Sequence, residues 1–426
     1  MTKEISPTFC PYPWTHLHAW PEGKAMLCCV AHGGENGGEV GDFSKNSYAE
    51  IMNSDKMKQV RVDMLAGKKL PQCYPCYQHE DLGVESYRQR VIKDHADQID
   101  DLLANTLEDG SLTRFYMSHM DYRFSNLCNL GCKTCGSPLS STIANSVADQ
   151  NEINWLRQKG VLSERETITS FTYKRPEFME VDVFPYINEN LRSFYFAGGE
   201  PLIMPEHSMI LDYLLETKQF DKQICYSTNL TTLRWKGKDF LEIWKNFNRI
   251  LWIGSIDGIH EKLQYIRRGS KHDTVFANLD KLIEMKELHP EKQYRVSICY
   301  THSIYNAYDT GEFIKFLDEN GYLDKLDDVI INYAYSDINS VAMLPDYAKL
   351  ELKQKRHSDM NTPWMQKFFS KFQGTENAFK QIDALIDTQI DQNTIHHFKQ
   401  YQSLTYDKFS SSFPWLSGVL DRLENK

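Results

Sequence analysis

The placement of the cysteines constrains this chain more than any other feature of its sequence. Ten cysteines occur in 426 residues, and eight of them lie within the first 135 residues. In a secreted chain such grouping predicts disulfide bonds, whereas in a large chain without a secretory signal it more often indicates metal binding or redox chemistry. The opening segment MTKEISPTFCPYPW has no basic stretch followed by an apolar run, so we expect no secretory signal.

Composition narrows the class of protein. Hydrophobic residues make up 41% and charged residues 25%, which is typical of an ordinary globular protein with a sizeable core. At roughly 150 residues per domain, the length suggests two or three domains. We find no run of about 18 apolar residues, so we expect no membrane span and a cytoplasmic protein. The net charge of −10 makes a nucleic-acid partner unfavourable.

The middle of the chain alternates between short apolar runs and helix-like stretches. The expected strands are 114–124, 193–199, 223–229, 250–258, 294–303 and 328–337, and the expected helices are 207–217, 239–247, 274–288 and 311–320. This alternation predicts βα units and a parallel sheet. About six such units would build an α/β fold, an incomplete (β/α)6 TIM-like barrel with its active site at the strand carboxyl ends.

The flanking segments differ from this middle region. Residues 1–90 form a small cysteine-rich module with helical spacing over 47–65. Residues 91–111 predict a helical connector to the partial barrel at 112–340. Residues 341–426 lack strand patterns and predict a helical C-terminal extension.

The segment CNLGCKTC carries the first chemical motif, with Cys128, Cys132 and Cys135 spaced C-x3-C-x2-C. Three thiolates on one tight loop can hold three irons of a cubane iron–sulfur cluster, which leaves the fourth iron open to an added ligand. A structural zinc site would instead require four ligands, so the alternative is a zinc knuckle completed by a distant residue such as His119.

This motif, at the end of a first strand, resembles the signature of radical S-adenosylmethionine (SAM) enzymes. The resemblance implies a [4Fe–4S] cluster whose free iron binds SAM. It also implies reductive cleavage of SAM to a 5′-deoxyadenosyl radical, with the protein supplying binding and orientation. Thr134, before the third cysteine, occupies a position that is often aromatic in the family and packs near adenine.

Three further segments resemble family motifs in family order. FAGGEPLI (196–203) resembles the GGEP motif, YSTN (226–229) a ribose and methionine segment, and SIDG (255–258) with IRRG (266–269) a further family run. The resemblance implies SAM contacts from Gly198, Gly199, Glu200, Pro201, Ser227, Asn229, Ser255 and Asp257, with Asn306 a weaker match. Glycines suit the GGEP turn because a side chain would block a ligand there. Read alone, each segment also fits a plain strand end.

A second set of cysteines precedes the barrel: Cys10, Cys28, Cys73 and Cys76. Four thiolates would fully ligate a second iron–sulfur cluster or a zinc ion. The set resembles the twitch module, a shortened relative of the SPASM domain, and implies an auxiliary [4Fe–4S] cluster in residues 1–90. The alternative is a structural zinc ribbon. Cys29 could replace Cys28 as the ligand, although the spacing from Gly23 favours Cys28.

The resemblance implies an oxidoreductase-type radical SAM enzyme that takes hydrogen from a peptide or small-molecule substrate. Its partners would be that substrate and an electron donor such as flavodoxin or ferredoxin. The alternatives are a nucleotide or nucleic-acid modifying enzyme and a non-catalytic interaction protein with a four-cysteine metal site. Cys225 and Cys299 lie in expected strands, and we interpret them as small buried hydrophobes.

Overall fold

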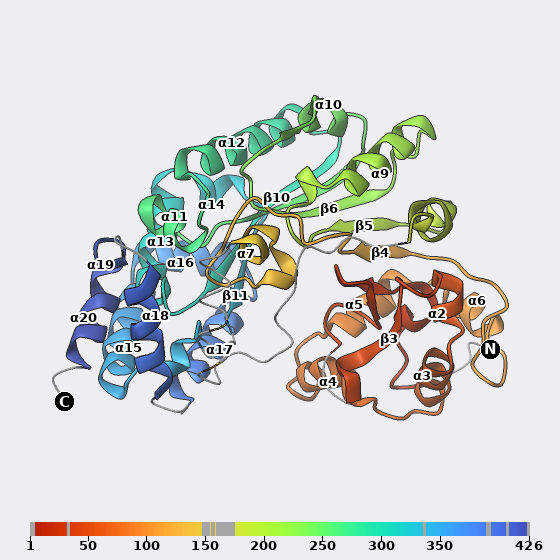
Figure 1. Ribbon diagram of the computed structural model, residues 1–426, viewed down its shortest axis with the longest axis horizontal. Helices are drawn as coiled ribbons and strands as arrows, with labels where there is room; N and C mark the ends of the chain where they lie inside the picture. The colour runs from red at the N-terminus through yellow and green to blue at the C-terminus, as the bar shows by residue number, and fades with distance from the viewer. Residues whose placement is uncertain are drawn as a thin grey trace. The chain divides into compact units, whose positions relative to one another are not determined.

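A computed structural model describes residues 5–31, 35–146, 154, 158, 175–334, 338–388, 393–405 and 409–423. The chain divides into two compact units. Unit 1 combines residues 1–126 with 171–225, and unit 2 combines residues 127–170 with 226–426. The chain therefore enters unit 2, returns to unit 1 and enters unit 2 again (Figure 1).

Unit 1 contains a mixed sheet in the order β5-β4-β1-β2-β3. The strands are β1 (His18–Ala19), β2 (Lys24–Met26), β3 (Glu39–Asp42), β4 (His119–Tyr122) and β5 (Ser193–Phe196). The first two barrel strands, β4 and β5, are parallel, and β1 pairs parallel with β4. The pairs β1–β2 and β2–β3 are antiparallel, so the cysteine-rich module extends the sheet from the edge of β4. Sequence patterns predicted none of these three short strands.

The helices of unit 1 are short and several are well capped. They are α1 (Tyr12–Thr15), α2 (Tyr48–Met52), α3 (Asp55–Leu65), α4 (Tyr74–Asp81), α5 (Tyr87–Asp94), α6 (Ile99–Ala104) and α9 (Pro205–Glu216). The helix expected over 47–65 is two helices, because Ser47 and Ser54 each cap a new start. Arg61 is fully buried and donates to the carbonyls of Pro13 at 2.8 Å and Gly110 at 2.7 Å. This arginine ties α3 to two loops of the module.

Unit 2 is built on the strands β6, β9, β10 and β11, in that order. Their bounds are β6 (Gln223–Thr228, which begins in unit 1), β9 (Arg249–Ser255), β10 (Gln293–His302) and β11 (Asp328–Tyr333). β9, β10 and β11 are parallel, with Ser255 opposite Cys299 in the register. The expected strands are confirmed here, although residues 335–337 of the last one lie outside the described residues. In the described part of unit 2 these strands make an open sheet, as an incomplete barrel requires.

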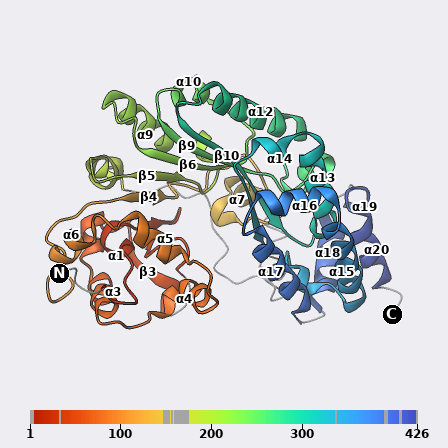
Figure 2. The same cartoon turned by 180° about the vertical axis from the view of Figure 1, so that it is seen from behind.

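Helices follow these strands in the order that the sequence predicts. They are α10 (Phe240–Trp244), α11 (His260–Ile266), α12 (His272–Leu288), α13 (Thr310–Glu319) and α14 (Tyr322–Lys325). Helix α12 packs on β10 (Figures 1 and 2). On β10 the buried face carries Val296, Ile298 and Tyr300, and the ring of Tyr300 stacks on Phe313 of α13 at 4.8 Å. This face is the core of unit 2.

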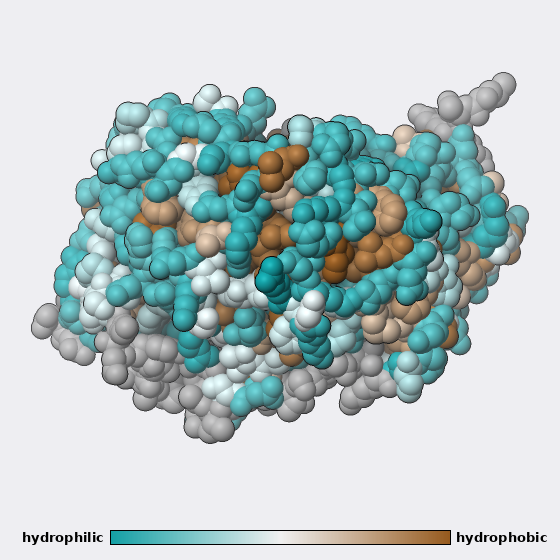
Figure 3. Space-filling view, turned by 90° about the horizontal axis from the view of Figure 1, so that it is seen from above, coloured by the Kyte–Doolittle hydropathy of each residue, from teal (hydrophilic) through white to brown (hydrophobic). Residues whose placement is uncertain are grey.

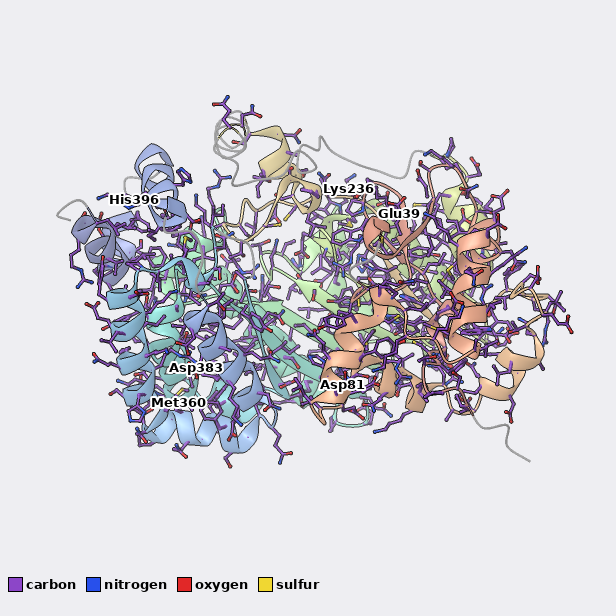
Figure 4. The ribbon with its side chains drawn as sticks, turned by 90° about the horizontal axis from the view of Figure 1, so that it is seen from below. Glu39, Asp81, Lys236, Met360, Asp383 and His396 are labelled. Atoms are coloured by element: carbon purple, nitrogen blue, oxygen red, sulfur yellow. The ribbon has the colours of Figure 1, made fainter. Side chains whose placement is uncertain are left out.

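The C-terminal region is helical, as the sequence predicts. Its helices are α15 (Asp346–Met360), α16 (Pro363–Lys371), α17 (Thr375–Asp387), α18 (Asn393–Thr405), α19 (Phe409–Ser412) and α20 (Pro414–Arg422). Arg356 of α15 pairs with Asp383 of α17 at 2.8 Å; Asp383 is labelled in Figure 4. Buried Gln402 of α18 accepts a hydrogen bond from Tyr265 of α11 and donates one to Tyr305. The extension is therefore anchored to the barrel helices.

The face of the molecule drawn in Figure 3 is mainly hydrophilic, with apolar residues gathered in smaller groups. Within the described part of the chain, every helix is too short or too polar to cross a bilayer.

Candidate functional site

The cysteine loop after β4 is held on one side by the turn that follows α11. The backbone N–H of Gly131 donates to the carbonyl of Arg268 at 2.9 Å, and that of Lys133 donates to Ile266 at 2.7 Å. A side chain at position 131 would collide with the Arg268 guanidinium, since its Cβ would lie 2.3 Å from Nη2. The IRRG segment is therefore a docking turn for the cysteine loop.

Serine and threonine hydroxyls hold the other side of the loop. Ser140 Oγ donates to the carbonyl of Leu130 at 2.6 Å, and Thr142 Oγ1 donates to the carbonyl of Cys128 at 2.7 Å. Ser140 also caps helix α7 (Ser141–Asn145) by accepting from the N–H of Ile143. These contacts fix the backbone of the loop before any ligand binds.

The three thiols of the loop differ in exposure, with Cys128 and Cys132 half-buried and Cys135 exposed. The N–H of Leu130 approaches Cys128 Sγ at 3.4 Å, and the N–H of Cys135 donates to the carbonyl of Cys132 at 3.1 Å. Burial raises the pKa of the Cys132 thiol to about 12. Iron binding must therefore displace protons, as it does in other thiolate sites.

Neither cysteine set converges on one metal-ion position. Among the residues that the structure describes, no group of three or more His, Cys, Asp or Glu side chains is placed to hold a metal ion. A structural zinc ion takes four converging ligands, whereas each cysteine of a cubane cluster binds a separate iron. His119, the candidate fourth zinc ligand, lies in unit 1 with Nδ1 2.8 Å from Ser193 Oγ.

Arg267 faces the cysteine loop from the docking turn. Its Nη1 lies 4.0 Å from Cys132 Sγ, and its Nε lies 2.8 Å from Oδ2 of Asp257. Asp257 is fully buried, and its Oδ1 accepts from the N–H of Thr301 at 2.8 Å. Asn306 donates to the Asp257 carbonyl at 2.9 Å. Oδ1 of Asp257 thus accepts a hydrogen bond, whereas Oδ2 meets Arg267 as an ion pair without hydrogen-bond geometry.

The other residues predicted to contact SAM in unit 2 lie near strand ends. Thr134 lies in the cysteine loop, half-buried, and Ser227 and Ser255 are half-buried near the ends of β6 and β9. Asn229 follows β6, and its Nδ2 donates to Oδ1 of Asn129 in the cysteine loop at 3.0 Å. The structure therefore joins the YSTN segment directly to the loop.

The GGEP segment belongs to unit 1, where it follows β5. Gly198 has φ +118°, and a Cβ there would lie 3.3 Å from Cδ of Arg123. Gly199 continues the turn, and Glu200 is buried with its carboxylate accepting from the N–H of Leu202 at 3.2 Å. Pro201 opens the 3-10 turn Pro201–Ile203 that leads to α9. The positive φ explains physically why glycine occupies position 198.

The four cysteines of the second set all lie in unit 1. Burial raises the pKa of Cys10 to about 12, and the neighbouring Cys73 and Cys76 thiols add to that rise. Cys73 caps helix α4 and Cys76 lies in its first turn, so their spacing of three places both on one face. Burial raises the pKa of Cys28 well above its ordinary value, and Cys10 and Cys73 are among the thiols that raise it further. Cys10 is thus close enough to Cys28, Cys73 and Cys76 for their charges to interact, and the neighbour that affects Cys28 most is Cys29.

Cys29 has different surroundings from Cys28. Burial raises its pKa to about 11, and its charged neighbours are Asp121 and Arg123. Tyr87 hydrogen-bonds to the Cys29 thiol and lies 2.9 Å from the Tyr12 hydroxyl. The two adjacent thiols thus differ in their surroundings, and Cys28 as the fourth ligand stays a prediction.

Sequence reasoning missed several polar residues around the two cysteine sets. Arg88 donates to the carbonyl of Phe9 at 2.7 Å and pairs with Glu80 at 2.5 Å, so it places a cation beside Cys10. No local pattern marks Arg88. For Arg267, the IRRG match marked the segment but not which arginine faces a thiol.

The interpretation of Cys225 and Cys299 as small buried hydrophobes is wrong. Both are half-buried. Alternation along β10 turns Cys299 away from the core face, and its Sγ lies 3.1 Å from Nδ2 of Asn332. Cys299 therefore lies on the opposite face of the sheet from Ile298 and Tyr300, with Asp257 and Arg267 as charged neighbours.

Two family models match the chain. A model of the radical SAM superfamily matches residues 122–288, which include the three cysteines of the loop. A model of the SPASM iron–sulfur cluster-binding domain matches residues 10–77, which include the four cysteines of the second set.

Solved structures with a similar chain are remote in sequence. SuiB of Streptococcus suis bound to S-adenosylmethionine is 13% identical, with 72% of this chain and 62% of that chain covered and a TM-score of 0.33. Native anSMEcpe with bound AdoMet is 14% identical. The match covers 71% of this chain and 98% of that chain, with a TM-score of 0.34. Native anSMEcpe with AdoMet and the Kp18Cys peptide is 16% identical, covering 51% of each chain, with a TM-score of 0.33. The chain thus spans about three fifths of the SuiB chain. None of the curated proteins compared is similar enough to match.

Proposed function

Because the chain belongs to the radical SAM superfamily and carries an N-terminal SPASM-type iron–sulfur domain, we propose that it reductively cleaves SAM and takes a hydrogen atom from an unreactive carbon of its substrate. When bound, the catalytic cluster and SAM supply the 5′-deoxyadenosyl radical, and the chain's residues supply binding and orientation. The observation that carries this proposal is the coincidence of each matched region with one patterned cysteine set.

Cys128, Cys132 and Cys135 would hold the catalytic [4Fe–4S] cluster on a loop fixed from both sides. That fixation matters because ligands held by surrounding hydrogen bonds need not be ordered when the cluster binds. The buried surroundings of the Cys132 thiol would exclude water from that side of the cluster. Exclusion of water strengthens electrostatic interactions inside the site.

The SAM contacts follow from the family motifs. Gly198 would let the ligand approach the backbone, and Glu200 would accept from the methionine amine. Ser227 and Asn229 would face the ribose and methionine parts. Ser255 would bind the ribose from the end of β9. Asp257 has the family position for the same role, and its two oxygens already contact Arg267 and Thr301.

Cys10, Cys28, Cys73 and Cys76 would hold the auxiliary cluster. Four thiolates leave no iron open, which favours a role in accepting an electron from the substrate radical over direct binding of substrate. Arg88 would offset part of the negative charge of that cluster, since it lies beside Cys10, Cys73 and Cys76.

The substrate class that we propose is a peptide or a small molecule, because SPASM-type domains accompany such substrates. An electron donor such as flavodoxin or ferredoxin would reduce the catalytic cluster.

The test is the formation of 5′-deoxyadenosine by protein reconstituted anaerobically with iron and sulfide, reduced with dithionite and given SAM. We expect the wild-type chain to form 5′-deoxyadenosine and methionine, measured by liquid chromatography with mass spectrometry. Cys128→Ala should fall to the background without protein. Cys225→Ala, which removes a thiol outside both sets, should retain the activity. A Cys128→Ala protein that still formed 5′-deoxyadenosine would refute the catalytic assignment.

A further inference from the structure

We propose that Arg267 is an electrostatic positioning residue for the catalytic cluster, held against the Cys132 sulfur by Asp257, and that it raises the reduction potential of that cluster. This inference rests on the proposed function, because it assigns a role to a residue of the same site. It concerns neither the cysteine ligands nor the SAM contacts. It explains why Asp257 of the SIDG segment pairs with Arg267 of the IRRG segment.

The geometry places a single guanidinium between two acidic groups. Nη1 of Arg267 lies 4.0 Å from Cys132 Sγ, while Nε of the same group lies 2.8 Å from Oδ2 of Asp257. The side chain of Arg267 is 12% exposed and that of Asp257 is 0% exposed, so water screens neither contact strongly. An arginine is suited to this position because its planar fork can contact two partners at once.

Asp257 is itself held in place by hydrogen bonds from strand β10 and from the segment that follows it. Its Oδ1 accepts from the N–H of Thr301, and its own carbonyl accepts from Asn306 at 2.9 Å. The following turn is tied to the cysteine loop by the backbone bonds from Gly131 to Arg268 and from Lys133 to Ile266. The guanidinium can therefore leave Cys132 Sγ only by giving up its contact with Asp257, and the backbone that carries it is hydrogen-bonded to the cysteine loop.

The effect on the cluster follows from charge. One-electron reduction of a [4Fe–4S] cluster from the 2+ to the 1+ state adds one negative charge, which an adjacent cation stabilises. Reduction potentials of such clusters depend on net charge and on hydrogen bonds to the sulfurs. A buried guanidinium within reach of a ligating sulfur supplies both. The negative charge of Asp257 offsets part of the positive charge of Arg267. The main contribution of Asp257 is therefore to hold the guanidinium in place.

The experiment measures the midpoint potential of the reconstituted cluster in the absence of SAM, by an anaerobic redox titration followed by electron paramagnetic resonance. The catalytic-cluster signal is identified as the one missing from Cys128→Ala. We expect Arg267→Gln to shift the midpoint to more negative potential, and Arg267→Lys to recover most of the shift because it keeps the charge. Loss of iron to a chelator should be on the order of 10- to 100-fold faster in Arg267→Gln.

The matched control is Arg356→Gln, which removes another buried arginine paired with an aspartate at 2.8 Å in unit 2. It should leave the midpoint potential unchanged. An Arg267→Gln protein with the wild-type midpoint would overturn the inference while leaving the proposed function intact. If Arg267→Gln takes up no iron, the midpoint potential of Arg267→Lys is the deciding measurement. A wild-type midpoint in Arg267→Lys supports the charge effect. A more negative midpoint in that variant overturns the inference. A wild-type chain that loads no cluster overturns both proposals.

Discussion

At the scale of single residues, the two candidate sites contain thiols whose pKa values are raised by burial and a glycine with a positive φ angle. Burial raises the pKa values of Cys10 and Cys132 to about 12, so the thiols are neutral near pH 7 until a metal displaces their protons. Gly198 adopts φ +118°, a region that other residues avoid. The same departures also occur outside the two sites, since Gly83 has φ +72° and burial raises the pKa of Cys225 to about 12.

Gly198→Ala should destabilise unit 1 and weaken SAM binding. The positive φ costs about 1–3 kcal/mol for a residue with a Cβ. The new Cβ would also press on Arg123, 3.3 Å away, which holds Asp121. Gly83→Ala is the matched control, because Gly83 has φ +72° and a Cβ added there would have no atom within 4 Å. Urea unfolding should show the larger loss for Gly198→Ala, and equal losses would contradict the contact argument.

Lowering the pH should destabilise the chain through His16. Burial, with nearby His119, lowers the pKa of His16 to about 3, and Nδ1 lies 2.8 Å from the carbonyl of His119. Between this pKa and the ordinary histidine pKa of about 6.5, His16 is protonated in the unfolded chain and neutral in the folded chain. The free energy of unfolding therefore falls as the pH drops from about 6.5 towards 3. Between pH 7.5 and 5.5 the loss should be about 1.4 kcal/mol.

Urea titrations at both pH values measure this loss. His16→Gln should lose less stability on acidification than the wild type, and exposed His79→Gln should behave like the wild type. An unchanged pH dependence in His16→Gln would contradict the assignment.

At the scale of elements, the sequence predicts the barrel strands well and the cysteine-rich module poorly. Strands such as β10 are long, and the helices that cover them carry clear apolar spacing. β1, β2 and β3 have two to four residues each, which is too few for an alternation of apolar and polar residues to be recognised in the sequence. Their pairing with β4 depends on a contact between segments distant in sequence, which local patterns do not contain.

The same limit applies to the candidate sites. Cysteine spacing predicts two sets of thiols, and each set lies within one of the two matched regions. Spacing could not predict that Arg88 and Arg267 supply cations beside these thiols, because both contacts are made across loops distant in sequence. The spacing from Gly23 favours Cys28 over Cys29, and that choice stays a prediction.

Gln402→Leu should loosen the C-terminal helices from the barrel. Gln402 is buried between the hydroxyls of Tyr265 and Tyr305, at 2.5 and 3.0 Å. Leucine would leave both hydroxyls without this partner, at a cost of about 1–3 kcal/mol.

Thermal unfolding followed by limited proteolysis of α18 measures that loss. Gln381→Leu is the control, because Gln381 is exposed where it accepts from Tyr333 and should cost much less. Equal stability of Gln402→Leu and Gln381→Leu would contradict an anchoring role for Gln402.

At the scale of the whole molecule, the two cysteine sets fall into different compact units. Unit 1 holds Cys10, Cys28, Cys73 and Cys76 together with the GGEP turn, and unit 2 holds the loop from Cys128 to Cys135. We propose that each set binds its own [4Fe–4S] cluster. It follows that removing one set should leave the other cluster in place.

The most direct test is the iron content of anaerobically reconstituted protein, with Mössbauer spectroscopy to identify the cluster type. We expect about eight irons per wild-type chain, and about four after replacing either Cys128, Cys132 and Cys135 or Cys73 and Cys76 with alanine. A wild-type content near four irons, or a single variant that loses all its iron while remaining folded, would contradict two independent clusters.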